Sequence, residues 1–254
     1  QCDRRQRQMC IRDSYTDPEK FEHIMEGFSM NWHFAAHESQ LSGKSAIELR
    51  HLESLLGEPM ILVSGDEIRC ISNVCTHRGM LLVDGSCSRR TLQCPYHGRT
   101  FGLDGTMKSM PEFDLTEDFP TAQDNLRTFP SISWKGLIFT GLEPSGLKAC
   151  LKEMEARIGW MPIEKFEHDH SRNRYYEIRA NWALYVDNYL EGFHIPFVHN
   201  DLNRALDYDD YRTEIFDGGV LQIGIASDGE TIFEIPEESP DFGLKVAAYY
   251  YWIY

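Results

Sequence analysis

The sequence predicts a mixed fold, in which an all-β domain is followed by an α+β domain. Between about residues 47 and 139, short apolar segments alternate with turn signals such as SGDE at 64–67, a pattern typical of β-hairpins. The stretch EPSG at 143–146 suits a domain boundary, and helical periodicity returns after it. A chain of 254 residues is long enough for one large domain or two small ones.

Four segments are expected along the chain. Asp17 and Pro18 are typical of a helix start, and apolar residues then recur at helical spacing. The first residues (QCDRRQRQMCIRDS) are arginine-rich without an apolar period, so they are excluded from fold reasoning. The predicted segments are a leader or foreign sequence (1–14), an N-terminal helical segment (15–45), an all-β domain (46–143) and an α+β domain (144–254).

The chain begins with Gln and ends within the strand-like aromatic run YYYWIY at 249–254, so we expect a fragment at both ends.

Apolar runs and turn signals predict the individual helices and strands. In the first domain the expected strands are 60–63, 68–71, 100–103 and 132–140. In the second domain we expect helices at 147–158 and 181–193, and strands at 175–178, 213–216, 220–225, 231–235 and 245–254.

Composition and charge narrow the functional classes. The formal net charge of −15 argues against nucleic-acid binding, because phosphate contacts need clustered Lys and Arg. Ordinary solubility explains this acidity most simply, and a basic redox partner or a cationic substrate would also fit it. No apolar run approaches the roughly 20 residues of a membrane span, and the seven cysteines do not form the pattern of a secreted disulfide framework. We expect a cytoplasmic protein without nucleic-acid or membrane partners.

The first candidate site consists of two short segments that each contain one Cys and one His. They read CTHRG from Cys75 and CPYHG from Cys94, so His77 and His97 complete a C-x-H and C-x2-H pattern. Structural zinc also takes two Cys and two His, but zinc fingers usually pair Cys with Cys and His with His. Chance spacing is the second alternative. A Rieske [2Fe–2S] centre, in which two His replace two Cys on one iron, fits the mixed loops best, so we expect these four residues to bind the cluster.

Residues beside these ligands carry a resemblance to the Rieske family. Respiratory-chain Rieske proteins have additional cysteines, which form a loop disulfide, at the positions of Met80 and Tyr96 here. The chain therefore resembles the low-potential branch, which comprises Rieske ferredoxins and Rieske oxygenases. Arg99 departs from the Trp that oxygenases often have after the His-Gly pair, and no ligand is lost by this change.

A second candidate site contains Glu191, His194 and His199 in an E-x2-H-x4-H pattern. Glu191 and His194 are three residues apart, so they share a face if the segment is helical. Pro196 is expected to break or kink the helix and to redirect His199. Alone, such a group is more often structural than metal-binding. Two His and one carboxylate are nevertheless the ligands of non-haem Fe(II) oxygenases.

The order of the two sites resembles the large (alpha) subunit of Rieske non-haem iron oxygenases, which include choline-monooxygenase-like enzymes and aromatic ring-hydroxylating dioxygenases. The segment DNYLEGFHIPFVH at 187–199 looks most like the choline-monooxygenase-like branch. The resemblance implies a helix-grip (START-like) catalytic domain, incomplete in this chain, with His194 and His199 as iron ligands. Chemistry alone suggests Glu191 as the third ligand. The resemblance instead implies that it bridges a Rieske histidine and an iron histidine, and that a downstream Asp completes the iron site.

The resemblance implies an oxygenase component that receives electrons from an NADH-dependent flavin reductase or a ferredoxin. The [2Fe–2S] cluster and Fe(II) would serve the reaction of O₂ with a small organic substrate, and the electron would cross between subunits of a homotrimer. An aromatic ring and a quaternary ammonium compound are the candidate substrates. The tyrosines of 249–254 could form a cation–π cage, although a core role explains them more simply. The alternative function is a Rieske electron-transfer protein without oxygenase chemistry of its own.

Overall fold

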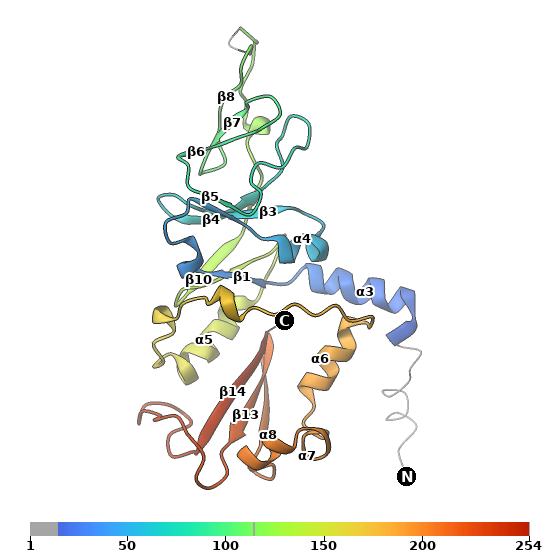
Figure 1. Cartoon of the computed structure of the whole chain (residues 1–254), viewed down its shortest axis with the longest axis vertical. Coiled ribbons are helices and arrows are strands. Elements are labelled where there is room, and N and C mark those ends of the chain that lie inside the picture. The colour runs from blue at the N-terminus through green and yellow to red at the C-terminus, as the bar shows by residue number, and fades with distance from the viewer. Residues whose placement is uncertain (1–14, 114, 254) are drawn as a thin grey trace. The chain divides into compact units, whose positions relative to one another are not determined.

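The computed structural model describes residues 15–113 and 115–253, so the predicted leader at 1–14 lies outside the described residues. The chain divides into two compact units, whose elements are labelled in Figure 1. We call them the β unit and the α+β unit, and the predicted mixed fold class is confirmed. The β unit comprises residues 29–145 and 162–173, and the described part of the α+β unit comprises residues 15–28, 146–161 and 174–253.

The helix predicted after Asp17 is present as α3 (Pro18–Ser29), and the Asp17 carboxylate accepts the Glu19 N–H at 3.0 Å. Its residues group with the α+β unit, because Trp182 lies against it. The ring centroids of Phe28 and Trp182 are 4.6 Å apart, and the Trp182 indole N–H donates to the Met25 sulfur at 3.1 Å. The helix ends at Ser29, whereas the predicted helical segment extends from 15 to 45.

Three antiparallel sheets form the β unit. Short helices connect them, namely α4 (Arg50–Leu56), η1 (Glu38–Leu41), η2 (Ala122–Asp124), η3 (Ile163–Lys165) and η4 (His170–Arg172). The largest sheet has the order β5 (Ser86–Cys87), β2 (Ala46–Glu48), β3 (Met60–Ser64), β4 (Ile68–Ser72) and β9 (Thr128–Phe129). The second sheet has the order β1 (His33–His37), β11 (Leu137–Thr140) and β10 (Ser131–Trp134). The third sheet has the order β6 (Thr91–Gln93), β7 (Thr100–Gly102) and β8 (Met107–Ser109).

Strand β3 explains how the β unit is held together. Successive strand residues point to opposite faces of a sheet. Ile61 and Val63 enter one apolar cluster, while Met60 and Leu62 enter a second cluster on the other face. A strand covered on both faces reads as a continuous apolar run, which is why the sequence MILV predicts the strand so clearly. The first cluster also contains the buried cysteines of the first candidate site.

One predicted strand of the β unit is a hairpin. The run at 132–140 was expected to be continuous, but β10 ends at Trp134 and β11 begins at Leu137. Lys135 and Gly136 between them have φ values of 48° and 83°. Two consecutive positive φ values make the tight turn that matches the twist of paired strands, so the chain reverses at the Lys-Gly pair that interrupts the apolar run.

The α+β unit combines helices with one antiparallel sheet. Its elements are α5 (Leu147–Ile158), α6 (Trp182–Leu190), α7 (Ile195–Val198), α8 (Asn200–Ala205) and the strands β12 (Arg212–Phe216), β13 (Gly219–Ile225) and β14 (Val246–Ile253). The sheet has the order β12-β13-β14. The predicted helix at 147–158 and the predicted strands at 213–216, 220–225 and 245–254 are present within the described residues.

Two predicted strands of this unit are absent. Residues 175–178 are irregular, with Tyr175 91% exposed, because they have no neighbouring strand to pair with. Residues 231–235 are also irregular, and a hydrogen bond from the Phe233 N–H to the Val246 carbonyl at 2.9 Å ties them to the start of β14. In both places β propensity without a pairing partner did not produce a strand.

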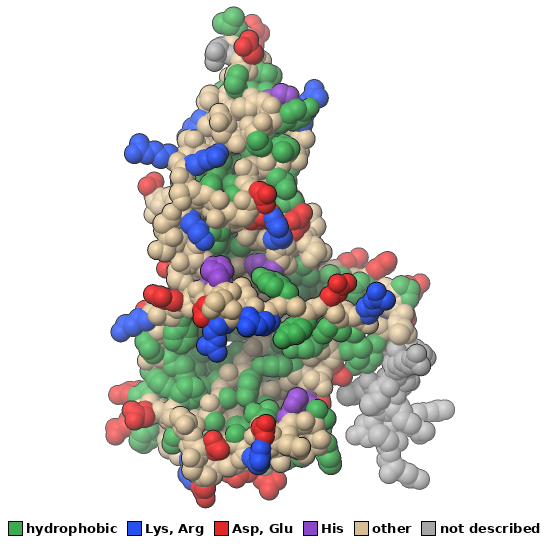
Figure 2. Space-filling view, in the orientation of Figure 1, with side chains coloured by type: hydrophobic (Ala, Val, Ile, Leu, Met, Phe, Trp, Pro, Cys, Tyr) green, Lys and Arg blue, Asp and Glu red, His purple; other side chains and the backbone are tan. Residues whose placement is uncertain are grey.

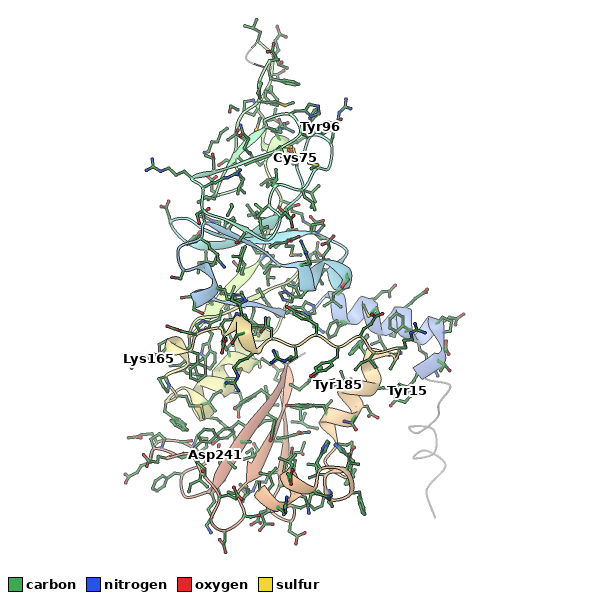
Figure 3. The ribbon with its side chains drawn as sticks, in the orientation of Figure 1. Tyr15, Cys75, Tyr96, Lys165, Tyr185 and Asp241 are labelled. Carbon is green, nitrogen blue, oxygen red and sulfur yellow. The ribbon has the colours of Figure 1, made fainter. Side chains whose placement is uncertain are left out.

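Arg157 of α5 fastens that helix to the sheet. Its guanidinium donates to Glu153 at 2.8 Å, to Asp241 at 2.7 Å and to Glu214 on β12. Asp241 is buried and also accepts the Tyr249 hydroxyl of β14 at 2.9 Å, and Figure 3 shows it beside the sheet. Opposite charges on three segments therefore surround one half-buried guanidinium.

Across residues 15–113 and 115–253, no helix is both long enough and apolar enough to cross a membrane. Among the described residues, Cys70, Cys75, Cys87, Cys94 and Cys150 are free cysteines.

Candidate metal centres

The two Cys-His segments form a pair of matching turns. The Cys75 carbonyl accepts the Gly79 N–H at 3.0 Å, and the Cys75 N–H donates to the Met80 carbonyl at 2.8 Å. Cys94 makes the same two bonds. Its carbonyl accepts the Gly98 N–H at 3.0 Å, and its N–H donates to the Arg99 carbonyl at 2.7 Å. Gly79 and Gly98 have φ values of 70° and 73°, which favour glycine because it has no Cβ. Each ligand pair is therefore held in a closed turn.

The turns place sulfur inside the unit and imidazole toward its surface. Cys75 and Cys94 are 2% and 3% exposed, whereas His97 is exposed and His77 is half-buried. The two imidazole ring centroids lie 4.8 Å apart. This donor set, with two thiols and two imidazoles in separate layers, fits a [2Fe–2S] cluster that takes two ligands on each iron. The sequence thus predicted residues that the structure brings together.

The electrostatic surroundings of these ligands are uneven. Burial and the adjacent Cys94 thiol raise the pKa of Cys75, against a backbone hydrogen bond that lowers it. Partial desolvation, together with the neighbouring His97 and arginine charges, lowers the pKa of His77. A lower imidazole pKa favours the neutral form, which is the form that binds metals.

Met80 and Tyr96 occupy the positions at which a loop disulfide would form. Both are exposed, and the Tyr96 ring lies 3.8 Å from the His97 ring between centroids. Figure 3 labels Tyr96 and Cys75 in the β unit. No disulfide can therefore link the two turns at these positions.

The second candidate site begins where α6 ends. The helix was expected to extend to 193, but its last residue is Leu190, and Glu191 has an extended backbone. The Glu191 carboxylate nevertheless contacts the His194 Nδ1 at 2.5 Å and accepts the Phe193 N–H at 2.5 Å. A non-helical turn, rather than a shared helix face, brings the carboxylate and the imidazole together.

Pro196 has a different role from the one predicted. It does not break a helix, because α6 has already ended; it lies in the first turn of the four-residue helix α7. His194 precedes α7 and His199 follows it, and their ring centroids are 5.1 Å apart. Proline is favoured at the start of a helix because its missing N–H would have no intrahelical partner there.

A cavity of about 320 Å³ lies beside these histidines within the α+β unit. Hydrophobic side chains gather on the visible face of this unit (Figure 2), and Figure 3 shows Tyr185 on α6. The cavity is mainly aromatic and apolar, with polar groups at a few points, as is usual for small-molecule sites. Its lining residues are Tyr185, Asn188, Tyr189, Glu191, His194, Ile195, His199, Leu202, Leu206, Tyr211, Gln222 and Tyr250.

Gln222 organises this cavity and was missed by sequence reasoning. It is 3% exposed, its amide donates to the carbonyls of Tyr189 and Leu190 at 3.1 and 2.8 Å, and its oxygen accepts the Tyr211 hydroxyl at 2.8 Å. Through these bonds, Gln222 on strand β13 provides donors for the free carbonyls at the C-terminal end of α6. The available signal was a lone amide inside the apolar run VLQIGI at 220–225.

The aromatic run on β14 divides between two faces, as strand geometry requires. Tyr249 and Tyr251 pack against the apolar cluster of the sheet, whereas Tyr250 lines the cavity. The Tyr189 ring lies 6.1 Å from that of Tyr250 and 6.3 Å from that of Trp252. Within the described part of the run, Tyr250 lines the cavity and its neighbours do not.

Within the described residues, no three His, Cys, Asp or Glu side chains are grouped closely enough to hold one metal ion. The matching turns supply pairs of ligands, which suits a cluster with two irons. His194 and His199 supply a third pair. Glu191 contacts the Nδ1 of His194, which leaves the Nε2 atom of that ring for a metal.

Family models match both parts of the chain. Residues 31–129 match the Rieske [2Fe-2S] domain, and residues 165–232 match the ring hydroxylating alpha subunit catalytic domain. The chain therefore belongs to the alpha subunits of the Rieske oxygenases, whose cofactors are a [2Fe–2S] cluster and Fe(II). The family and the cofactors predicted from the sequence are confirmed.

Two curated relatives show which members the chain is similar to. It is 28% identical to a chloroplastic choline monooxygenase of Beta vulgaris, over 94% of this chain and 54% of the relative. It is also 28% identical to the carnitine monooxygenase oxygenase subunit of Escherichia coli K12, over 94% of this chain and 64% of the relative. The chain thus spans about half to two thirds of the length of these relatives.

Solved structures agree with this placement. A quaternary ammonium Rieske monooxygenase superposes with a TM-score of 0.72 at 28% identity, over 88% of this chain and 62% of the other. Naphthalene 1,2-dioxygenase from Rhodococcus sp. superposes with a TM-score of 0.66 at 24% identity, over 87% of this chain and 55% of the other. The second match shows the shared fold alone.

Proposed function

We propose that this chain is the oxygenase component of a Rieske system that hydroxylates a quaternary ammonium compound. Cys75, His77, Cys94 and His97 would hold the [2Fe–2S] cluster, in agreement with the two closed turns. His194 and His199 would bind Fe(II). The observation that carries the proposal is the second histidine pair, which borders a tyrosine-lined cavity in the same chain as the matching turns.

When bound, the cluster would supply single electrons and the Fe(II) would supply the site of O₂ activation. The protein's own residues orient the ligands and shape the cavity. Glu191 fixes the orientation of the His194 ring through Nδ1, so the Nε2 lone pair is available to a metal. Gln222 holds the end of α6, on which Tyr185 and Tyr189 reach the cavity.

Glu191 also suits a role in electron transfer between subunits. Its side chain remains 32% exposed after contacting His194, so a carboxylate lone pair is left for a second donor. A ring N–H of His77 or His97 from a neighbouring copy in a homotrimer would be that donor. Inter-subunit electron transfer is described for one matching quaternary ammonium Rieske monooxygenase. A flavin reductase or ferredoxin would supply the electrons.

The cavity favours a quaternary ammonium group over an unsubstituted aromatic ring. Tyr185, Tyr189, Tyr211 and Tyr250 line it, and aromatic faces attract a cation that has no hydrogen-bond donors. The relatives at 28% identity are named as choline and carnitine monooxygenases. An aromatic ring is the second candidate substrate, since aromatic and apolar side chains also line the cavity.

Nitric oxide bound to Fe(II) gives an EPR signal that tests the iron site directly. We expect the anaerobic, cluster-loaded protein with added Fe(II) and nitric oxide to show this signal, and His194→Ala or His199→Ala to remove it. The matched control is His51→Ala, because His51 is an exposed histidine of the β unit. A signal unaffected by both ligand variants would overturn the assignment.

The same signal distinguishes the substrates. Choline or carnitine near the iron should perturb it, and naphthalene should not. Perturbation by naphthalene alone would favour an aromatic substrate.

The alternative is an electron-transfer protein without oxygenase chemistry. It is favoured by the lack, among the described residues, of a third side chain grouped with His194 and His199 to hold one ion. Iron analysis tests the oxygenase function, since two irons per chain correspond to the cluster alone and three include the Fe(II) of an oxygenase. Binding of a third iron that depends on His194 and His199 would exclude the carrier.

A further inference from the structure

Arg99 is a buried arginine directly behind the second ligand turn. It is 3% exposed. Because arginine is almost never buried without a partner, such a residue is expected to make ion pairs or hydrogen bonds. Its own carbonyl closes the turn by accepting the Cys94 N–H at 2.7 Å. Its guanidinium reaches away from this turn, and its contacts connect three separate segments of the β unit.

The first connection is to the other ligand turn. Arg99 Nη1 donates to the Thr76 hydroxyl at 3.0 Å, and Thr76 lies between the proposed ligands Cys75 and His77. The Thr76 hydroxyl in turn donates to the Asp124 carbonyl at 2.7 Å. One guanidinium therefore ties the turn that precedes it to the turn that contains Thr76.

The second connection is an ion pair between Arg99 Nη2 and the Asp124 carboxylate. Asp124 is held in place from its own side, because its other oxygen accepts the N–H of Thr121 at 2.8 Å and the hydroxyl of Thr121 at 3.0 Å. The Asp124 side chain is 22% exposed. The planar guanidinium fork is suited to holding two acceptors at once, which a lysine ammonium does less well.

The remaining surroundings of Arg99 are apolar. The guanidinium carbon lies 5.9 Å from the ring centroid of Phe101 and 5.4 Å from that of Phe119. Its Nε atom is buried and makes no hydrogen bond. In such surroundings a charge acts over a longer distance than it does in water.

We infer that Arg99 is a positioning residue that fastens the two cluster-binding turns together and, with Asp124, sets the reduction potential of the cluster. This inference rests on the ligands proposed above. The clamp occupies the role that a loop disulfide cannot take here, because Met80 and Tyr96 stand at its positions. Reduction adds a negative charge, so a nearby cation favours it and a nearby carboxylate opposes it.

Four variants separate charge from clamping. Arg99→Gln leaves the Asp124 charge unbalanced, so the potential should become more negative. Asp124→Asn leaves the Arg99 charge unbalanced, so the potential should become more positive. The double variant should return close to the wild-type value. Thr76→Val removes a clamp contact without changing any charge, so it should leave the potential nearly unchanged and speed the loss of the cluster on warming.

The measurement is a redox titration of the cluster followed by EPR, with circular dichroism as the check on folding. Arg50→Gln is the matched control, because Arg50 is an arginine of the same unit whose side chain is 70% exposed and also pairs with carboxylates. Should Arg99→Gln fail to fold, Asp124→Asn and Thr76→Val still test the two parts separately.

Shifts of the same sign, or no shift, in Arg99→Gln and Asp124→Asn would overturn the inference. A folded Thr76→Val that keeps its cluster as long as the wild type would overturn the clamp. These results differ from failure of the ligand proposal, in which the wild-type protein itself would show no Rieske signal.

Discussion

The two proposed metal centres are positioned in different ways. In the β unit, each Cys and His pair lies in one closed turn, and both turns pack on a sheet that is covered on both faces. In the α+β unit, His194 and His199 flank a single-turn helix, and the cavity beside them is built from α6, α8 and two strands. The first centre depends on local backbone geometry, whereas the second depends on contacts between distant segments.

This difference predicts where substitutions have their effects. Loss of a turn ligand should remove one centre and leave the rest of the fold intact. Damage to the contacts that join helix and sheet in the α+β unit should instead lower the stability of the whole unit.

The largest effect is expected for Cys94→Ser in the β unit. A serine hydroxyl does not replace a thiolate as a cluster ligand, so we expect loss of the Rieske absorption and of nearly all bound iron and sulfide. The matched control is Cys87→Ser, because Cys87 is a half-buried free thiol outside both turns. Wild-type iron and sulfide in Cys94→Ser would contradict this assignment.

The next largest effect is expected for Arg157→Ala in the α+β unit. It leaves the buried Asp241 carboxylate without its cation and detaches α5 from the sheet, so the free energy of unfolding should fall by about 3–5 kcal/mol. Urea titration measures this change. Lys245→Ala, which removes an exposed ion pair with Asp228 in the same unit, should have little effect. Equal losses of unfolding free energy in the two variants would show that burial of an ion pair does not determine its contribution to stability.

A smaller effect is expected at the iron site itself. Glu191→Ala removes the carboxylate that orients His194, so the affinity for Fe(II) should fall by about 10- to 100-fold. Glu191→Gln keeps an acceptor for the ring N–H and should lose less. Anaerobic Fe(II) titration provides the measurement, with Glu230→Ala as an exposed control. An unchanged affinity in Glu191→Ala would place the carboxylate outside the iron site.

An effect confined to alkaline pH compares one buried thiol from each unit. Burial raises the pKa of Cys70 to about 12, and burial together with the Glu153 charge raises the pKa of Cys150 to about 11. An unfolded thiol ionises from about pH 9, while the folded thiol stays protonated, so unfolding is favoured as the pH rises. Each thiol should lower the stability of its unit by up to ~1.4 kcal/mol per pH unit, starting near pH 9.

Urea titrations under reducing conditions test this dependence. Cys150→Ala should make the fall in stability between pH 9 and 11 shallower for the α+β unit, and Cys70→Ala should do so for the β unit over pH 9 to 12. Slopes equal to those of the wild type would contradict it. Below pH 9 neither substitution should change the slope.

Sequence reasoning succeeded where the determining contacts are local. The ligand turns span five residues each, and their Cys, His and Gly pattern contains most of what closes them. The run at β3 was equally clear, because burial on both faces leaves a continuous apolar signal. The Lys135–Gly136 turn was missed although this pair interrupts the apolar run, because the run was read as one strand across a glycine that marks the reversal.

The second site was predicted by its residues and not by its geometry. Glu191 and His194 do meet, but through a turn after the end of α6 rather than on a helix face. Gln222 is separated from α6 by more than 30 residues, so no local pattern could connect it with Tyr189. The strands expected at 175–178 and 231–235 failed for the same reason, since pairing partners are set by the tertiary fold.

The central claim is that Cys75, His77, Cys94 and His97 hold a Rieske cluster, and EPR of the anaerobically reconstituted and reduced protein tests it most directly. We expect a Rieske spectrum, and we expect His77→Cys or His97→Cys to shift it toward that of an all-cysteine [2Fe–2S] centre. A silent spectrum in the folded, reconstituted wild-type protein, or a spectrum unchanged in both variants, would contradict the account.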